Sequence, residues 1–181
     1  MNLPQNILKC GLLALLVGGL SLASQAQNDR KSPHVKTDGS IGTCEVSLTY
    51  GSPYVKDRKI WGDLVPYDKV WRTGADEATT IEISQNLMIE GQDLPAGKYG
   101  LFTVPGKDKW TIVFNSVSDQ WGAFSYDKTK DVLRVEVTPK ETDKFSEQLT
   151  FKIKEKDGYS KVVMMWENMS VGFKAEPLAS N

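Results

Sequence analysis

The fold follows from the stretch Leu149-Thr-Phe-Lys-Ile-Lys-Glu-Lys-Asp-Gly-Tyr-Ser-Lys-Val-Val-Met-Met-Trp166. Apolar and polar side chains alternate from Leu149 to Ile153, and they alternate again from Val162 to Trp166. A period of two residues is typical of a β-strand that buries one face. Between the two runs, Asp157-Gly158 suits a tight hairpin turn, where a positive φ is needed. This stretch therefore predicts an antiparallel hairpin.

The same alternation recurs along the rest of the chain. It is found at residues 43–50, 80–84, 110–114, 133–137 and 171–173. Turn sequences rich in Pro and Gly separate these runs, and no window of eleven or more residues shows helical spacing. The pattern predicts an all-β fold, an antiparallel β-sandwich or jelly roll of roughly ten short strands with one long ordered loop.

Two runs predict more about the core. Cys44 shares a face with Val46, so we expect it to be a small buried core residue rather than a reactive thiol. In the run from Trp110 to Phe114, the intervening Thr111 and Val113 are themselves partly apolar. We therefore expect that strand to be covered on both of its faces.

The beginning of the chain is typical of an export signal. Lys9 supplies a positive charge, residues 10–23 form an apolar run, and Ser24-Gln-Ala26 provides the small residues of a cleavage site. The run is shorter than the roughly 20 residues that cross a bilayer. We expect a signal peptide at 1–26, a polar N-terminal tail at 27–40, one β-sandwich domain at 41–175 and a C-terminal tail at 176–181. The predicted location is periplasmic or secreted.

The charge balance excludes several classes of partner. Removing residues 1–26 takes away one lysine and leaves 21 basic and 23 acidic side chains, a net charge of −2. Nucleic-acid binding depends on clustered Lys and Arg, so none is expected. A polybasic contact with a membrane surface is disfavoured for the same reason, and no other segment is apolar enough to span a membrane. Cys44 would be the single remaining cysteine, so no internal disulfide is predicted.

The motifs of known catalytic and metal sites are missing from the sequence. His34 is the only histidine, so a Ser-His-Asp or Cys-His device would depend on it. There is no His/Cys cluster for zinc, no EF-hand loop and no glycine-rich phosphate loop. We predict no catalytic residue, no metal and no cofactor. Paired carboxylates remain the one acid–base arrangement, with Asp76 or Glu77 meeting a distant acid such as Asp127.

Several longer runs resemble one protein family. They are Arg58-Lys-Ile-Trp-Gly-Asp-Leu-Val-Pro-Tyr67, Val70-Trp-Arg-Thr-Gly-Ala-Asp-Glu-Ala-Thr79, Leu94-Pro-Ala-Gly-Lys-Tyr-Gly-Leu-Phe102, Trp121-Gly-Ala-Phe-Ser-Tyr126 and Asp131-Val-Leu-Arg134. Together they resemble the domain of unknown function 2911 family, from about Ser32 to Phe173. The resemblance implies a single β-rich domain exported by a Gram-negative bacterium. It implies no reaction, cofactor or ligand.

The segment from Tyr50 to Thr79 is the candidate ligand site. It has no regular period, yet it holds three tyrosines, two tryptophans and two arginines. Long ordered connections are usually functional. Aromatic faces stack on apolar ring surfaces, and Arg recognises carboxylates in a planar fork. The predicted ligand-binding residues, which include a second aromatic group after residue 120, are Trp71, Arg72, Glu77, Asp76, Arg58, Trp61, Trp121 and Tyr126.

The same residues also permit a structural interpretation. Arg58 or Arg72 would then pair with Glu77 and staple the loop to the sandwich. The sequence favours a non-enzymatic binding module for a glycan, a lipid-derived molecule or a small carboxylated ligand. The alternatives are a carboxylate-dependent hydrolase and a structural or interaction module of the cell envelope with an unknown protein partner.

Overall fold

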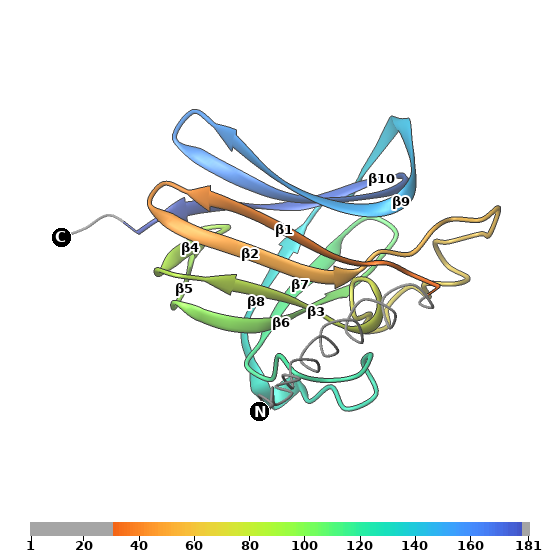
Figure 1. Cartoon of the computed structure of the whole chain (residues 1–181), viewed down its shortest axis with the longest axis horizontal. Helices are drawn as coiled ribbons and strands as arrows, with labels where there is room; N and C mark the ends of the chain where they lie inside the picture. The colour runs from red at the N-terminus through yellow and green to blue at the C-terminus, as the bar shows by residue number, and fades with distance from the viewer. Residues whose placement is uncertain (1–30, 179–181) are drawn as a thin grey trace, which may run out of the picture.

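The computed structural model describes residues 31–178, in which two antiparallel sheets pack face to face (Figure 1). This confirms the all-β sandwich; the predicted signal peptide lies outside the described residues. One 3-10 turn, η1 (Lys128–Lys130), interrupts the strands. The strands are β1 (His34–Ile41), β2 (Cys44–Gly51), β3 (Ala75–Ile83), β4 (Leu87–Ile89), β5 (Gln92–Leu94), β6 (Gly97–Val104), β7 (Trp110–Asn115), β8 (Asp131–Val137), β9 (Lys140–Lys156) and β10 (Tyr159–Pro177). Within residues 31–178, no helix has the length and apolar character to cross a lipid bilayer.

One sheet has six strands in the order β1-β2-β3-β6-β7-β8, and the other has four in the order β5-β4-β10-β9. The predicted hairpin turn is confirmed, because Lys156 pairs with Tyr159 and Gly158 has a φ of 79°. β9 and β10 are 17 and 19 residues long, well beyond the short strands expected. The first half of β9 is largely exposed on both faces. It therefore lacks the alternation of apolar and polar residues by which a strand is recognised in a sequence.

The inner faces of the two sheets form the main core. Cys44 is 1% exposed and lies on the buried face of β2, as predicted. β1 begins at His34, inside the segment expected to be a polar tail. It pairs with β2 from His34–Gly51 to Ile41–Cys44 and forms an edge of the sheet. An edge strand with one polar face needs few apolar residues, and for this reason its alternating pattern is weak in the sequence.

A smaller apolar cluster lies on the outer face of the six-stranded sheet. Phe102, Val113 and Ala78 are buried there, and the residues packed against them are Val70, Ala123 and Tyr126. Strand β7 is therefore covered on both faces, as its sequence predicted. Ala123 and Tyr126 belong to residues 116–126, which follow β7 and which we call the covering loop.

The long loop between β2 and β3, residues 52–74, is hydrogen bonded to both sheets. The Ser52 hydroxyl donates to the carbonyl of Leu149 in β9 at 2.5 Å. The backbones of Trp71 and Thr103, which lies in β6, exchange hydrogen bonds of 2.8 and 2.9 Å. The apolar side chains of this loop that lie in the main core are Val55, Ile60, Val65 and Trp71. The loop is thus ordered and contributes to the core.

Candidate functional site

The two tryptophans of the long loop turn inward. Trp71 is 8% exposed, and its ring lies 5.9 Å from that of Trp166 at an interplanar angle of 17°. Trp61 meets the rings of Trp71, Trp110 and Trp166 edge-on at 5.9, 5.0 and 5.8 Å. The Trp71 indole nitrogen donates to the carbonyl of Gly74 at 3.2 Å. These four rings pack against one another, so Trp61 and Trp71 belong to a cluster of indoles at the core of the sandwich.

Arg58 is exposed and uses its guanidinium within its own turn. Its Nε donates to the carbonyl of Val55 at 3.0 Å, and Nη2 donates to the carbonyl of Tyr54. These bonds organise the exposed tip of the long loop. The structure therefore places Arg58, like Trp61 and Trp71, among contacts that hold the loop together.

Arg72 and Asp76 lie beneath the covering loop. The Arg72 Nε is buried and has no hydrogen-bond partner among the described residues. Burial lowers the pKa of the Arg72 guanidinium, and the nearby Asp76 carboxylate opposes that shift. Asp76 has a φ of 62°, and its carbonyl accepts a 3.0 Å hydrogen bond from the amide of Gly122.

Glu77 and Trp121 form a cross-strand pair. The amide of Ala78 donates to the carbonyl of Gln120 at 3.0 Å, and together with the Gly122–Asp76 bond this brackets the pair. In such a non-hydrogen-bonded antiparallel pair, the two opposite side chains lie on the same side and approach most closely. Trp121 is nevertheless 59% exposed. Of the predicted residues, the structure brings Glu77 and Trp121 together at the surface.

Beside this pair lies an open groove of about 380 Å³ on the outer face of the six-stranded sheet. We call it the loop groove, because the covering loop forms one of its walls. Its lining residues come from four strands and from that loop: His34, Thr49, Glu77, Ala78, Thr80, Lys98, Ser118, Asp119 and Gln120. Side chains with hydroxyl, amide and charged groups predominate.

Of these lining residues, only Glu77 belongs to the ligand-binding set predicted from the sequence. Thr49 and Thr80 stand directly opposite each other in the register of β2 and β3. The sequence pattern predicts that both threonines lie on the polar face of their strands. It does not predict which strands are neighbours in the sheet. The groove depends on that strand order, and so it was not predictable from the pattern alone.

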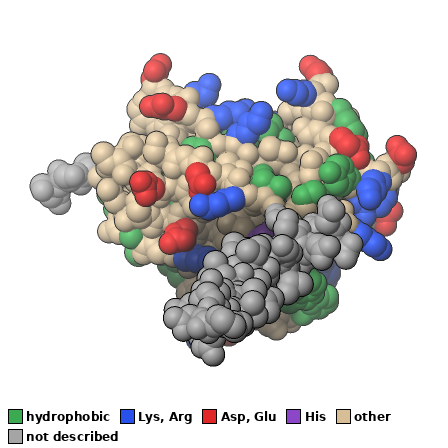
Figure 2. Space-filling model, viewed as in Figure 1, with side chains coloured by type: hydrophobic (Ala, Val, Ile, Leu, Met, Phe, Trp, Pro, Cys, Tyr) green, Lys and Arg blue, Asp and Glu red, His purple; other side chains and the backbone are tan. Residues whose placement is uncertain are grey.

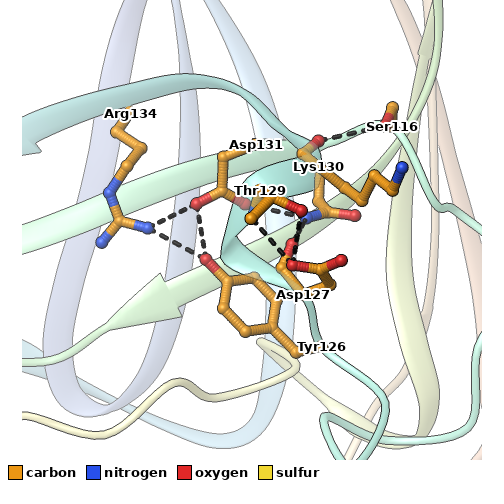
Figure 3. Close-up of polar contacts among 8 residues, drawn as sticks. Ser116, Tyr126, Asp127, Thr129, Lys130, Asp131 and Arg134 are labelled. Atoms are coloured by element: carbon orange, nitrogen blue, oxygen red, sulfur yellow. Dashed lines mark hydrogen bonds and ion pairs between the residues drawn. The ribbon is translucent and has the colours of Figure 1, made fainter.

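Tyr126 fastens the end of the covering loop to β8 (Figure 3). Its hydroxyl donates to Asp131 Oδ2 at 2.6 Å, and Arg134 Nη1 donates to the same carboxylate oxygen at 2.6 Å. Asn115 Nδ2 donates to Asp131 Oδ1 at 2.8 Å. Burial, followed by the hydrogen bond to Asp131 and its charge, raises the pKa of Tyr126 to about 12. We call this cluster of Tyr126, Asp131 and Arg134 the Tyr126 latch. It keeps the phenol of Tyr126 protonated.

Asp127, considered above as a distant acid, caps η1. Its carboxylate accepts from the amide and the hydroxyl of Thr129 at 2.9 and 2.7 Å, and these bonds lower the pKa of Asp127. The loop groove instead brings Asp119 to the same lining as Glu77. Among residues 31–178, no group of three or more His, Cys, Asp or Glu side chains could hold a metal ion.

Charge is mixed on the face that Figure 2 shows. In the view of Figure 2, acidic and basic side chains are interspersed and do not gather by sign. The loop groove has the same character, since Lys98 lines it together with Glu77 and Asp119. Its lining does not select strongly for either an anion or a cation.

Comparison with known proteins gives one match. The family model described as "Protein of unknown function (DUF2911)" matches residues 32–175. No curated protein and no solved structure matches the chain.

Proposed function

The chain belongs to the DUF2911 family of proteins of unknown function, and from its own geometry we propose that it is an exported protein that binds a glycan in the loop groove. The observation that carries the proposal is the exposed indole of Trp121 beside a polar groove: its cross-strand partner Glu77 and its chain neighbour Gln120 both line that groove. An aromatic face stacks on the apolar side of a sugar ring. Hydroxyl, amide and carboxylate groups around it match the sugar hydroxyls.

The lining supports a glycan over the other two ligand classes. A lipid-derived ligand calls for a largely apolar pocket, whereas Thr49, Thr80 and Ser118 place hydroxyl groups in this groove. A small carboxylate is best held by the fork of an arginine, and the Nε of Arg72 is buried. Lys98 is the one Lys or Arg in the lining, and two carboxylates accompany it.

One observation favours a second function, a carboxylate-dependent glycoside hydrolase. Glu77 and Asp119 both line the loop groove, and glycoside hydrolysis commonly uses two carboxyl groups on either side of the scissile bond. The sequence offers no other acid–base device. Binding without turnover is the simpler function, because the indole and the polar lining suffice for it.

The binding test uses the chain beginning at residue 27. Thermal unfolding is followed with neutral and acidic oligosaccharides, and a ligand at a hundred times its dissociation constant adds about 2.7 kcal/mol to the unfolding free energy. Trp121→Ala removes the shift. Phe145→Ala is the matched control, because Phe145 is 51% exposed on β9 of the other sheet. A shift that survives in Trp121→Ala contradicts the proposal.

A product assay on each oligosaccharide that binds separates the two functions. Release of shorter sugars that stops in both Glu77→Gln and Asp119→Asn, while the thermal shift remains, establishes the hydrolase. Binding without any product in the unaltered chain establishes the binding protein.

Export is part of the proposal and has its own test. Support comes from Lys9, the apolar run at 10–23 and the small residues up to Ala26. The full-length chain is produced in a Gram-negative host. The intact mass of the protein recovered from the periplasm and from the medium is measured by mass spectrometry. We expect a mature chain beginning at Gln27. A full-length mass in the cytoplasmic fraction alone contradicts export.

A further inference from the structure

A second hollow lies on the same outer face of the six-stranded sheet. Its volume is about 500 Å³, and the polar residues that β1, β2 and β3 contribute to its lining are Lys36, Asp38, Ser40, Glu45, Ser47 and Glu82. We call it the far hollow. It has no large apolar side chain in its lining, and its polar groups resemble those of the loop groove.

The strand register makes the two hollows neighbours. Thr49 pairs with Thr80 in the loop groove, and Ser47 pairs with Glu82 in the far hollow. Residues two apart on a strand point to the same face, so these pairs are successive outward positions on β2 and β3. Glu82 also stands opposite Lys98, which lines the loop groove.

β1 extends this continuity along the edge of the sheet. His34 lines the loop groove, whereas Lys36, Asp38 and Ser40 line the far hollow. All four are alternate residues of one strand. From His34 to Ser40 is six residues, or about 20 Å at the rise of a β-strand. The combined surface is long enough for several sugar units in an extended chain.

We propose that the loop groove and the far hollow form one trough that binds a linear, neutral glycan along β2 and β3, with the exposed Trp121, the cross-strand partner of Glu77, beside one end. This inference rests on the proposed glycan binding and adds the shape and charge class of the ligand. Hydroxyl side chains follow the trough at Ser47, Thr49 and Thr80. They offer both donors and acceptors to successive sugar units.

The charges in the trough favour a neutral polymer. Lys36 Nζ lies 3.0 Å from the carboxylate of Asp38 in an exposed ion pair, and the opposite charges of Glu82 and Lys98 stand on paired positions. Each hollow contains one lysine, Lys36 or Lys98, and the two linings together contain five carboxylates, Asp38, Glu45, Glu77, Glu82 and Asp119. A polyanion would therefore meet like charge along the whole trough, and a polycation would meet a lysine in each hollow.

The test is a chain-length series measured by calorimetry. Cello-, malto- and chito-oligosaccharides from one to six sugar units are the probes, with the chain beginning at residue 27. For the series that needs Trp121, we expect the dissociation constant to fall at least about tenfold from dimer to hexamer, which corresponds to about 1.4 kcal/mol. The affinity then levels off once the trough is filled.

The variant Ser47→Tyr fills the far hollow from an outward position on β2, where tyrosine suits a strand. We expect it to abolish the gain in affinity of the hexamer and to leave the dimer unchanged. Ser146→Tyr is the matched control, a partly buried strand serine on β9 of the other sheet. It should leave the whole series unaltered.

The outcomes separate the two claims. Equal affinity for dimer and hexamer, still dependent on Trp121, overturns the trough and leaves glycan binding intact. A length dependence that persists in Ser47→Tyr also overturns the trough. If no probe binds, or if binding does not depend on Trp121, both the trough and the proposed function fall.

Discussion

The rings of Trp71 and Trp166 are stacked, with centroids 5.9 Å apart and planes 17° from parallel. Trp71 comes from the long loop and Trp166 from β10, so the stack joins the loop to the four-stranded sheet. Trp110, at the start of β7, belongs to the six-stranded sheet. Its ring centroid lies 6.4 Å from that of Trp71. The loop is thus held to both layers by aromatic contacts as well as by hydrogen bonds.

The stability of the protein should depend very differently on two of its tryptophans. Trp71→Ala leaves a cavity in the core and should lower the unfolding free energy by about 3–5 kcal/mol. Trp121→Ala removes an exposed side chain and should change it by less than about 0.5 kcal/mol. Urea denaturation of the two variants measures both values. Similar losses in the two variants would contradict the difference in burial between Trp71 and Trp121.

The Tyr126 latch should give the protein a signature at alkaline pH. The pKa of Tyr126 is raised from 10.0 to about 12 in the folded state, so folding retains the phenol proton. The resulting stability is fully present below pH 10 and is lost as the pH rises through 12. Tyr126→Phe should therefore show a shallower fall in unfolding free energy between pH 10 and 12.

At neutral pH the same variant should be less stable by about 1.5 kcal/mol, because it loses a hydrogen bond to a charged carboxylate. Tyr159→Phe is the control, since its hydroxyl lies outside the latch. Denaturant titrations at several pH values give the slopes. Parallel profiles for Tyr126→Phe and the unaltered chain would rule out the latch.

Cys44 should be inert to thiol reagents until the protein unfolds. It is 1% exposed, and its sulfur lies 3.5 Å from the carbonyl oxygens of Glu45 and Gln85. In the chain beginning at residue 27, Ellman's reagent should react only after urea is added. Ser47→Cys in a Cys44→Ala background puts a thiol on the outer face of the same strand and should react at once. Rapid labelling of Cys44 in the folded state would contradict its burial.

Two glycines should differ sharply in their tolerance of a methyl group. A Cβ on Gly51 would lie 2.1 Å from the carbonyl oxygen of Ala75, whereas one on Gly91 would meet nothing within 4 Å. Gly91 has a φ of 82°, so Gly91→Ala should cost about 1–2 kcal/mol through backbone strain alone. Gly51→Ala must instead separate the backbones of β2 and β3 and should cost more. Unfolding free energies in the reverse order would contradict this close approach.

The sequence predicted what depends on local periodicity. The alternating runs identified the buried faces of β2 and β10, and Asp157-Gly158 identified the turn of the long hairpin. Each of these features involves residues within a few positions of one another. Burial of one face then requires the alternation that the sequence displays.

The sequence could not separate its buried tryptophans from its exposed one. Trp71 and Trp121 both lie in segments without a period, and both follow turn-rich sequence. Trp71 is buried because Trp110 and Trp166, distant along the chain, meet it from two sheets. The backbone at Thr73 and Asp76, with φ of 57° and 62°, is likewise set by tertiary contacts. The local sequence contains neither the partners that bury a tryptophan nor the tertiary contacts that set these φ angles.

The hydrogen bond between Ser52 and Leu149 has a consequence for how the chain folds. It spans 97 residues, and contacts so distant along the chain form only after the entropy of closing a large loop has been lost. Folding dominated by such pairings takes milliseconds to seconds, not microseconds. The long loop can dock only when β9 is in place, so the tryptophan cluster should close among the last events of folding. A chain with this order of assembly remains open for longer, which would suit the proposed passage through an export channel.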